Sequence, residues 1–501
     1  MPSLAPPSSR NLTSRASSVF HDHEFYVPKS KAYELLPFRF EKLDRDQYVA
    51  VNEVGEWQTL NRSQLEVFVK KQLSQDSALY RALKSKHFLV DEDSSVAVDL
   101  LILKYRSKHH RVSEFTSLHM FVVTLRCNHS CQYCQVSRQS EDRSAFDMTP
   151  EMADKAIDFT FRSPSRNIKI EFQGGEPLLN FDLIKYITLQ VKERNQQAGK
   201  NLEFVIATNL SVLNDDILLF CREHKILIST SLDGPEDLHN MNRPKMGNDS
   251  YQVTIDGINR ARNALGVDNV SALMTTTTAS LPRVTEIIDE YVKQGFRGIF
   301  LRSLSPYGFA IKTRCFDGYQ SNEWLDFYRR GLDYIIEMNR RGYKFVEHFA
   351  AIILQKMLTP YGTGFVNLRS PAGIGIAAII FNYNGDVYPS DEARMKAEMG
   401  DRIFKMGNLS ENTYEEMMLS PALLEPLEAT VLESLPMCEQ CAFLPWCGSD
   451  PDYHYATQKD FVGHKMLSGF CKKHMDVFKY LLLLMERDEK TRGILESWVR
   501  W

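Results

Sequence analysis

Residues 118 to 315 alternate short apolar runs with longer amphipathic segments, and this alternation restricts the fold more than any other feature of the sequence. The six apolar runs are HMFVVTL, IKIEFQ, EFVIAT, ILISTSL, VSALMTTTT and GIFLRSL. Segments of helical period separate them, as at 150–162, 181–195 and 214–224. Six β-then-α units in series predict an α/β fold with a parallel sheet and outer helices, either an open doubly wound sheet or a partial barrel. Both architectures bind ligands at the carboxyl ends of the strands, so we expect functional residues there.

The chain has 501 residues, too many for one ordinary domain, and we divide it into four parts. We expect a flexible tail, a small module with a strand hairpin and two short helices (62–74 and 77–85), an α/β core, and a C-terminal domain. The basic run KYRSKHHR at 104–111 is expected to be a solvated linker. The four parts are residues 1–25, 26–110, 115–345 and 346–501.

Charge and hydropathy exclude several classes of protein. The net charge of -4 arises from 60 basic and 64 acidic residues, so no overall field attracts nucleic acid or an anionic membrane. The apolar runs fall short of the roughly 18 residues that a membrane-spanning helix needs. The start, MPSLAPPSSRNLTSRASS, lacks the apolar core of a secretion signal. We therefore expect a cytoplasmic protein without a membrane or nucleic-acid partner.

Three cysteines follow the first apolar run as C-x3-C-x2-C: Cys127, Cys131 and Cys134. Three thiolates on one loop can bind three irons of a 4Fe-4S cube and leave the fourth iron open. Zinc with a distant fourth ligand is the alternative that this spacing leaves. Cys221 and Cys315 stand alone and are expected to be buried or incidental thiols.

Further polar and glycine residues stand where the next strands are predicted to end. Gly174-Gly175-Glu176 follow the second run, Asn209 the third and Ser231 the fourth. Each has a purely structural interpretation, since Gly-Gly and Ser form turns and Asn caps helices. Their joint position at strand ends instead favours a binding site.

These motifs together resemble the radical SAM (S-adenosylmethionine) superfamily. The resemblance rests on CNHSCQYC with its Tyr133, the GGEP segment, ATNLS, STSLDGP and, less specifically, Arg243 in MNRP. It implies a partial (β/α)6 barrel in which the three cysteines hold a 4Fe-4S cluster that binds SAM. It also implies reductive cleavage of SAM to a 5′-deoxyadenosyl radical, with a flavodoxin or ferredoxin as electron donor. The residues implied to contact SAM are Tyr133, Gly174, Gly175, Glu176, Asn209, Ser231 and Arg243.

A second group of four cysteines lies near the C-terminus: Cys438, Cys441, Cys447 and Cys471. Four thiolates form a closed site for structural zinc or a 4Fe-4S cube, and their spacing does not choose between them. The pattern resembles the SPASM extension of peptide-modifying radical SAM enzymes, which usually holds two auxiliary clusters. Here Ser390 and Pro451 stand where that family has cysteines, so we expect one auxiliary 4Fe-4S cluster.

Asp391, beside Ser390, matches a position that serves as a general base in some relatives, and we take it as a candidate catalytic residue. An aspartate in a turn or a salt bridge is the alternative interpretation.

The whole layout is most similar to the radical SAM maturase of the His-Xaa-Ser repeat system. The first module resembles a winged-helix element that recognises peptides, although a structural cap is an equal alternative. The resemblance implies a ribosomally made precursor peptide as substrate and a second radical SAM maturase as a partner. Two alternatives remain: a sulfatase-type maturase that oxidises a Cys or Ser of a protein, and a non-catalytic zinc-binding interaction protein.

Overall fold

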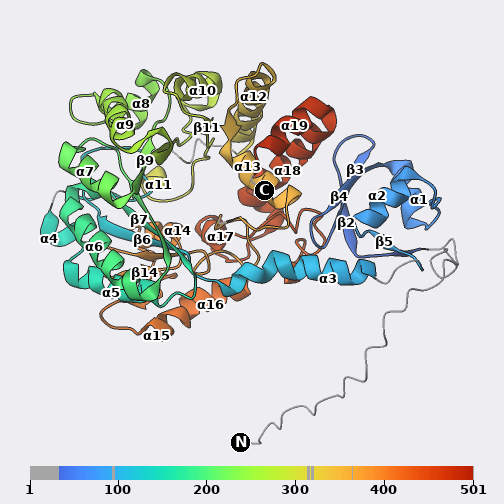
Figure 1. Ribbon diagram of the computed structural model, residues 1–501, viewed down its shortest axis with the longest axis horizontal. Helices are drawn as coiled ribbons and strands as arrows, with labels where there is room; N and C mark the ends of the chain where they lie inside the picture. The colour runs from blue at the N-terminus through green and yellow to red at the C-terminus, as the bar shows by residue number, and fades with distance from the viewer. Residues whose placement is uncertain are drawn as a thin grey trace, which may run out of the picture.

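A computed structural model of the protein describes residues 33–92, 96–140, 142–312, 316, 321–363 and 365–499. An α/β body occupies one side of the molecule, and a smaller N-terminal module lies on the other (Figure 1). The tail predicted at 1–25, and Cys315, lie outside the described residues.

The body is organised around one sheet with the strand order β10-β9-β8-β7-β6-β13-β14-β15. Strands β6 to β10 are all parallel, and β13 pairs in parallel with β6 at the other side. The hairpin β13-β14 and strand β15 continue it in antiparallel fashion. This mixed sheet agrees with the predicted α/β fold and a partial barrel. The strands are β6 (Leu118–Thr124), β7 (Asn167–Gly174), β8 (Asn201–Ala207), β9 (Ile226–Ser231), β10 (Val270–Leu273), β13 (Ala378–Phe381), β14 (Asp386–Tyr388) and β15 (Gly407–Asn408).

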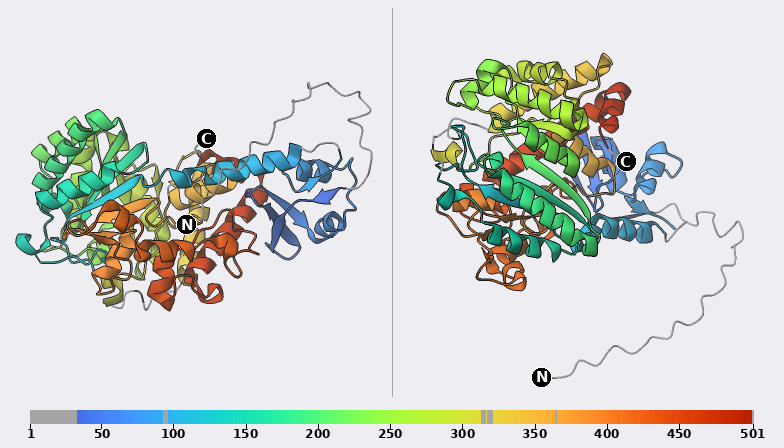
Figure 2. Two further views of the ribbon diagram at one scale, coloured as in Figure 1. Left: turned by 90° about the horizontal axis from the view of Figure 1, so that it is seen from below. Right: turned by 60° about the vertical axis from the view of Figure 1, so that its left-hand side comes forward.

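Helices between the strands cover the outer face of the sheet (Figures 1 and 2). Their apolar sides join the side chains of the strands in one large core, which includes Phe172 on β7 and Ile184 on α6. The signals for their first residues are local: Thr149 caps α5 and Asn214 caps α7 through their side chains. The helices are α5 (Pro150–Phe161), α6 (Phe181–Ala198), α7 (Asp215–His224), α8 (Glu236–Asn242), α9 (Ser250–Leu265) and α10 (Val284–Lys293).

The sixth apolar run differs from the prediction. It forms only the short strand β11 (Gly298–Ile299), which pairs with β12 (Val346–Glu347) in a separate two-stranded sheet. The buried carboxylate of Glu347 accepts the backbone N–H of Leu301 at 3.1 Å, so that amide bonds to a side chain instead of a neighbouring strand. The same carboxylate caps α13 (His348–Leu358). Among the described residues, β10 is therefore the edge strand of the main sheet. On the side of β6 away from β7, the sheet is extended by β13, which comes from the C-terminal part of the protein.

The N-terminal module has its own small core, which includes Tyr33, Phe68 and Phe88. As predicted, it contains a strand hairpin and two short helices, the first of which begins with a capping box between Asn61 and Gln64. Its elements are β1 (Glu34–Leu35), β2 (Phe38–Lys42), β3 (Gln47–Asn52), β4 (Trp57–Asn61), α1 (Arg62–Val69), α2 (Ala78–Ser85) and β5 (Leu89–Val90).

The basic run at 104–111 is not a solvated linker. Most of it belongs to helix α3 (Val96–His109), which runs along the molecule between the module and the body (Figure 2). Lys104 pairs with Glu56, and Lys108 donates to the carbonyl of Val54 at 2.9 Å. The basic side chains thus bind the turn between β3 and β4. The sequence showed the charges but not the turn that they meet.

The N-terminal module docks on the segment that carries the second group of cysteines. The indole N–H of the buried Trp446 donates to the carbonyl of Gly55 at 3.0 Å. Lys479 on α18 (Gly469–Arg487) forms a 2.7 Å ion pair with Glu41 on β2. This hydrogen bond and this ion pair therefore join the N-terminal module to the C-terminal region.

None of the helices that the structure describes is long and apolar enough to cross a membrane.

We expect the Gly55→Ala variant to loosen this interface. Gly55 has φ +84°, and a Cβ there would lie 2.7 Å from the Trp446 indole nitrogen and 2.8 Å from Lys108 Nζ. The strain and the clash together should lower the free energy of unfolding by about 2–3 kcal/mol. The matched control is Gly199→Ala, because Gly199 has φ +63° but open space around its Cβ position. Equal shifts of the two variants in anaerobic denaturant unfolding would contradict the docking contact.

Candidate functional site

A cavity of about 560 Å³ opens at the carboxyl ends of strands β6 to β9 and extends to the C-terminal region. Most of the predicted site residues meet there, although they come from six separate segments of the protein. The predicted residues that line it are Cys127, Cys131, Cys134, Tyr133, Gly174, Gly175, Asn209, Ser231, Arg243 and Asp391. Glu176 and the four C-terminal cysteines lie outside its lining.

The cysteine loop is anchored at its start by Arg126. The Arg126 guanidinium makes two hydrogen bonds to the carboxylate of Asp147, at 2.7 and 2.8 Å, and a third to the carbonyl of Leu179 at 2.8 Å. Thr124, the last residue of β6, donates to the same carboxylate at 2.6 Å. A paired, planar guanidinium fixes direction as well as distance. The backbone is therefore held immediately before the first cysteine.

The two glycines of GGEP let the end of β7 approach this anchored backbone. A Cβ on Gly174 would lie 1.9 Å from the carbonyl oxygen of Thr124, and one on Gly175 would lie 2.3 Å from that of Arg126. The N–H groups of Gly175 and Glu176 donate to the same two oxygens, at 2.9 and 2.7 Å. Side chains larger than hydrogen are thus excluded by the backbone of the cysteine loop itself.

Glu176 lies beneath the cavity and connects two strand ends. Its fully buried carboxyl accepts hydrogen bonds from the Thr208 hydroxyl at 2.6 Å and from the N–H of Asn209 at 2.7 Å. A third comes from the N–H of Leu178 at 3.0 Å. Burial raises the pKa of Glu176 to about 7, and the three hydrogen bonds oppose this shift. The Glu176 carboxyl thus holds the backbone of Asn209, and the SAM contact expected from the sequence at Glu176 stays a prediction.

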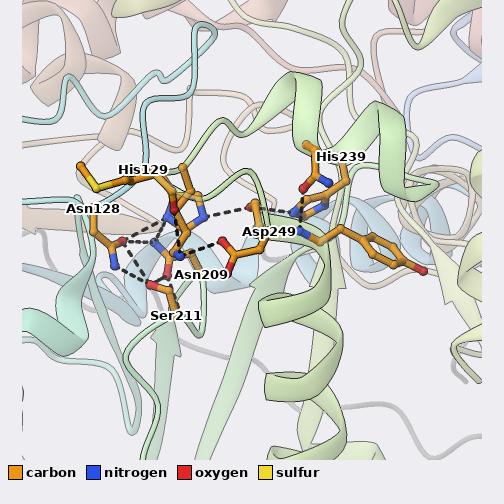
Figure 3. A network of polar contacts seen from close by, with 11 residues as sticks. Asn128, His129, Asn209, Ser211, His239 and Asp249 are labelled. Atoms are coloured by element: carbon orange, nitrogen blue, oxygen red, sulfur yellow. Dashed lines mark hydrogen bonds and ion pairs between the residues drawn. The ribbon is translucent and has the colours of Figure 1, made fainter.

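Asn209 lies at the centre of a polar network (Figure 3). Its side-chain nitrogen lies 3.1 Å from Asn128 Oδ1 and 3.0 Å from His129 Nδ1, and its oxygen accepts the N–H of Ser211 at 2.9 Å. The other ring nitrogen of His129 lies 2.9 Å from the Ser250 hydroxyl. Sequence reasoning missed Asn128, His129 and Ser211, although the first two lie inside the C-x3-C motif. Their effect is to join the cysteine loop to the end of β8.

Tyr133 and Arg243 share one buried carboxylate, that of Asp233. The Tyr133 hydroxyl donates to Asp233 Oδ2 at 2.5 Å, and Arg243 Nε donates to the same oxygen at 3.1 Å. The Arg243 guanidinium also lies 5.4 Å from the centre of the Tyr133 ring. The backbone N–H of Thr275 contacts the other carboxylate oxygen at 3.3 Å. Asp233 was missed, although its place directly after β9 in SLDGP could have indicated it.

The three thiols of the loop suit a cluster in their present surroundings. Burial raises the pKa of both Cys127 and Cys131 to about 12, so at neutral pH these thiols keep their protons unless a metal replaces them. Within the described ranges no group of three His, Cys, Asp or Glu side chains is close enough to hold a single metal ion.

The second group of cysteines also gathers in one place. Burial, together with the nearby thiols of Cys471 and Cys438, raises the pKa of Cys441 to about 11. Cys447 lies near Cys441 and Cys471, and burial raises its pKa as well. The buried Lys356 donates to the carbonyl of Cys447 at 2.8 Å. The four cysteines thus lie in one neighbourhood, and none of them lines the cavity.

Ser390 and Asp391 begin helix α14 (Asp391–Ala397) at the cavity wall. Asp391 accepts a hydrogen bond from Arg394 Nε at 3.0 Å. Ser390 caps the helix and donates to Asp452 at 2.6 Å, and Asp452 pairs with the buried Lys396 at 2.7 Å. The buried ion pair of Asp452 and Lys396 therefore lies beside Ser390, the position at which the SPASM extension has a cysteine of its first auxiliary cluster.

The model of the Radical SAM superfamily matches residues 121–301, which include the cysteine loop and the ends of β6 to β10. This protein has a radical SAM domain.

Curated relatives extend beyond this domain. A serine-type anaerobic sulfatase-maturating enzyme of Bacteroides thetaiotaomicron is 25% identical over 382 residues, 72% of this chain and 88% of that protein. A cysteine-type anaerobic sulfatase-maturating enzyme of Clostridium perfringens is 20% identical over 371 residues, 71% of this chain and 93% of that protein. An uncharacterized protein of Methanocaldococcus jannaschii is 32% identical over 187 residues, and the match spans 61% of its length. With a radical SAM domain and relatives of this kind, the protein is an enzyme. The alternative of a non-catalytic zinc-binding interaction protein is therefore wrong.

Solved structures show the same fold. The structure titled "Native anSMEcpe with bound AdoMet" superposes with a TM-score of 0.61 at 16% identity, and the match covers 76% of this chain and all (100%) of that chain. The structure of Streptococcus suis SuiB bound to S-adenosylmethionine gives a TM-score of 0.50 at 13% identity, over 85% of this chain and 97% of that one.

Replacing Glu176 by Gln should change how stability depends on pH. The pKa of Glu176 is about 7 in the fold against an ordinary value of 4.5, so its contribution is complete below pH 4.5 and is lost as the pH rises through 7. In the unaltered protein, ionisation of Glu176 should lower the free energy of unfolding by on the order of 3 kcal/mol between pH 5 and pH 8. Glu176→Gln should remove that slope and cost about 1–3 kcal/mol at pH 5, because an amide N–H₂ would face other donors.

Denaturant unfolding at the two pH values measures both effects. Glu193→Gln, at an exposed position on α6, is the control and should retain the slope of the unaltered protein. An unchanged slope in Glu176→Gln would contradict the assignment.

Proposed function

We propose that this enzyme is a radical SAM maturase that modifies side chains of a ribosomally made precursor peptide. The observation that carries the proposal is the meeting of the three loop cysteines with Asn209, Ser231 and Arg243 around one cavity. When bound, a 4Fe-4S cube and SAM would supply the 5′-deoxyadenosyl radical that abstracts a hydrogen atom from the substrate.

The protein's own residues would bind and orient these groups. Cys127, Cys131 and Cys134, which line the cavity, would hold the cube through three of its irons and leave the fourth without a protein ligand from this loop. Tyr133, Asn209, Ser231 and Arg243 would contact SAM. The Asp233 carboxylate fixes two of these four, Tyr133 and Arg243, before the ligand arrives, which reduces the entropy lost on binding. The glycines would act at one remove, by bringing β7 against the cysteine loop.

One auxiliary 4Fe-4S cluster on Cys438, Cys441, Cys447 and Cys471 completes the proposal. A site with four cysteine ligands leaves no iron open, which suits electron transfer or structural support. A flavodoxin or ferredoxin of the reducing cytoplasm would serve as electron donor.

The substrate class is supported by what the relatives and neighbours are named for. One solved neighbour, with a TM-score of 0.60, is titled as binding AdoMet and a Cp18Cys peptide. In this protein the N-terminal module would hold the precursor by adding a strand to its hairpin edge. A second radical SAM maturase and a His-Xaa-Ser repeat peptide are the finer part of the proposal.

A sulfatase-type maturase is the second candidate. It is favoured by the curated sulfatase-maturating relatives, whose similarity extends over 71–72% of this chain. Mass analysis of both substrate types with the same reconstituted enzyme separates the two candidates, because only one of them should change mass.

Replacing each group of cysteines should remove one of the two proposed clusters and leave the other in place. The triple variant with Cys127, Cys131 and Cys134 replaced by Ala should retain about four of about eight irons per protein molecule and form no 5′-deoxyadenosine. Cys438→Ala with Cys447→Ala should lose the other four. Iron and acid-labile sulfide analysis with an assay for 5′-deoxyadenosine measures both. Cys221→Ala is the control, since Cys221 is buried in the core away from both groups. Undiminished 5′-deoxyadenosine in the triple variant would exclude the proposed mechanism.

Asp391→Asn tests the candidate base. With a peptide that the unaltered enzyme modifies, product formation should fall by about 10²–10⁴-fold, because general acid–base groups contribute that much. Formation of 5′-deoxyadenosine should persist, since Asp391 acts on the substrate. Equal losses of product and 5′-deoxyadenosine would instead indicate that the Asp391–Arg394 pair is structural.

A further inference from the structure

The cavity continues from the cysteine loop to a wall of aromatic rings. These rings come from the segment after β11, from helix α12 (Ser321–Arg340), from α13, from the loop after it and from α18. We call them the aromatic row: Phe300, Trp324, Phe349, Phe365, Phe470 and His474. The radical SAM domain supplies one end of the cavity, and the segments that follow β11 supply this other end.

The rings of the aromatic row contact one another, and Phe349 lies beside four of them. Phe349 lies 5.6 Å from Phe300, 6.3 Å from Phe365, 6.5 Å from Trp324 and 5.8 Å from His474, measured between ring centres. Phe470 lies 4.1 Å from His474. These separations are those of packed aromatic pairs. The wall is therefore continuous, and it presents ring faces and edges to the cavity.

Two donors among the residues that line the cavity have no partner within the described structure, and one of them, the Trp324 indole N–H, belongs to the aromatic row. Trp324 and Tyr307 are each 2% exposed and line the cavity. The Trp324 indole N–H and the Tyr307 hydroxyl make no hydrogen bond there. An indole nitrogen can only donate, so it needs an acceptor. Leaving such groups unpaired is unfavourable, and an occupant that brings an acceptor would relieve the cost.

The charge beside the row restricts the occupant further. Lys473 lines the cavity, with its ammonium 5.7 Å from the centre of the Trp324 ring and 3.3 Å from the Ser303 hydroxyl. This ammonium is a further hydrogen-bond donor beside the Trp324 ring, which favours an occupant that carries an oxygen or nitrogen acceptor.

We propose that the aromatic row is a specificity pocket for a planar ring side chain of the peptide substrate, one whose ring carries a hydrogen-bond acceptor. Tyrosine and neutral histidine are the two sources of this chemistry. The ring packs against Phe349 and Phe365, and its acceptor meets the free N–H of Trp324, whose ring lies 6.5 Å from that of Phe349. This inference rests on the proposed function, because it assumes a peptide substrate. It deepens that function by naming the residue class that enters the cavity.

Binding of small probes to the anaerobically reconstituted enzyme tests the pocket without requiring turnover. The probes are the N-acetyl amides of tyrosine, histidine, phenylalanine and leucine, titrated by ligand-observed NMR. The tyrosine or the histidine probe should bind about tenfold more tightly than the leucine probe. Equal affinities of all four probes, or no measurable binding of any, would overturn the proposal.

Two variants locate the binding site. Trp324→Phe keeps a ring but removes the N–H, so the preference for tyrosine over phenylalanine should fall by about threefold or more. Phe365→Leu keeps apolar volume but removes planarity, so the preference for rings over leucine should fall to a similar degree. Tyr361→Leu is the matched control, because Tyr361 is exposed on the same segment and lies outside the lining.

Unchanged preferences in both variants would overturn the proposal even if the unaltered enzyme prefers rings. The outcome is independent of 5′-deoxyadenosine formation, which tests the proposed function itself. An enzyme that cleaves SAM but binds all probes alike would retain the function and lose this pocket.

Discussion

The structure depends on the contact between two strand ends, where the backbone of Gly174 and Gly175 meets the backbone that leads into the cysteine loop. A Cβ at either glycine would lie 2.3 Å or less from a carbonyl oxygen of Thr124 or Arg126. Only hydrogen side chains permit this approach, and the Arg126–Asp147 pair keeps the other partner in place. The positions of the three cysteines follow from this contact, and so does the cavity beside them.

Around this contact, buried acids connect elements that lie far apart in the sequence. Glu176 joins β7 to the end of β8, and Asp233 joins Tyr133 to Arg243. Glu347 does the same further along, where it takes the N–H of Leu301 and caps α13. Each acid accepts from several donors, which is how buried carboxyl groups are usually satisfied. Glu176 orients the site without lining the cavity, and a list of cavity residues alone would miss that role.

Specific contacts join the C-terminal region to the α/β body and the N-terminal module to the C-terminal region. Strand β13 extends the sheet beside β6, and Trp446 receives the turn that contains Gly55. As a consequence, one end of the cavity is made by the radical SAM domain and the other by the aromatic row and α14. Under the proposed function, substrate chemistry and substrate recognition would fall on different segments, so that recognition could vary without disturbing the cysteine loop.

The sequence by itself determined the local features: the strands and helices of the core, the cysteine loop, and the polar residues at strand ends. These follow from hydrophobic period and motif spacing, which act over a few residues. Tertiary structure decided which distant segments meet. The run GIFLRSL was expected in the main sheet, but the Glu347 carboxylate takes its amide, and that side chain lies 46 positions away from Leu301. The basic run at 104–111 lies mostly in helix α3, and its Lys108 side chain binds a carbonyl of the turn at Val54. Glu176, a residue expected to contact SAM, lies outside the lining of the cavity. Partners that meet only after folding leave no periodic signal, because their pairing depends on three-dimensional distance and not on spacing along the sequence.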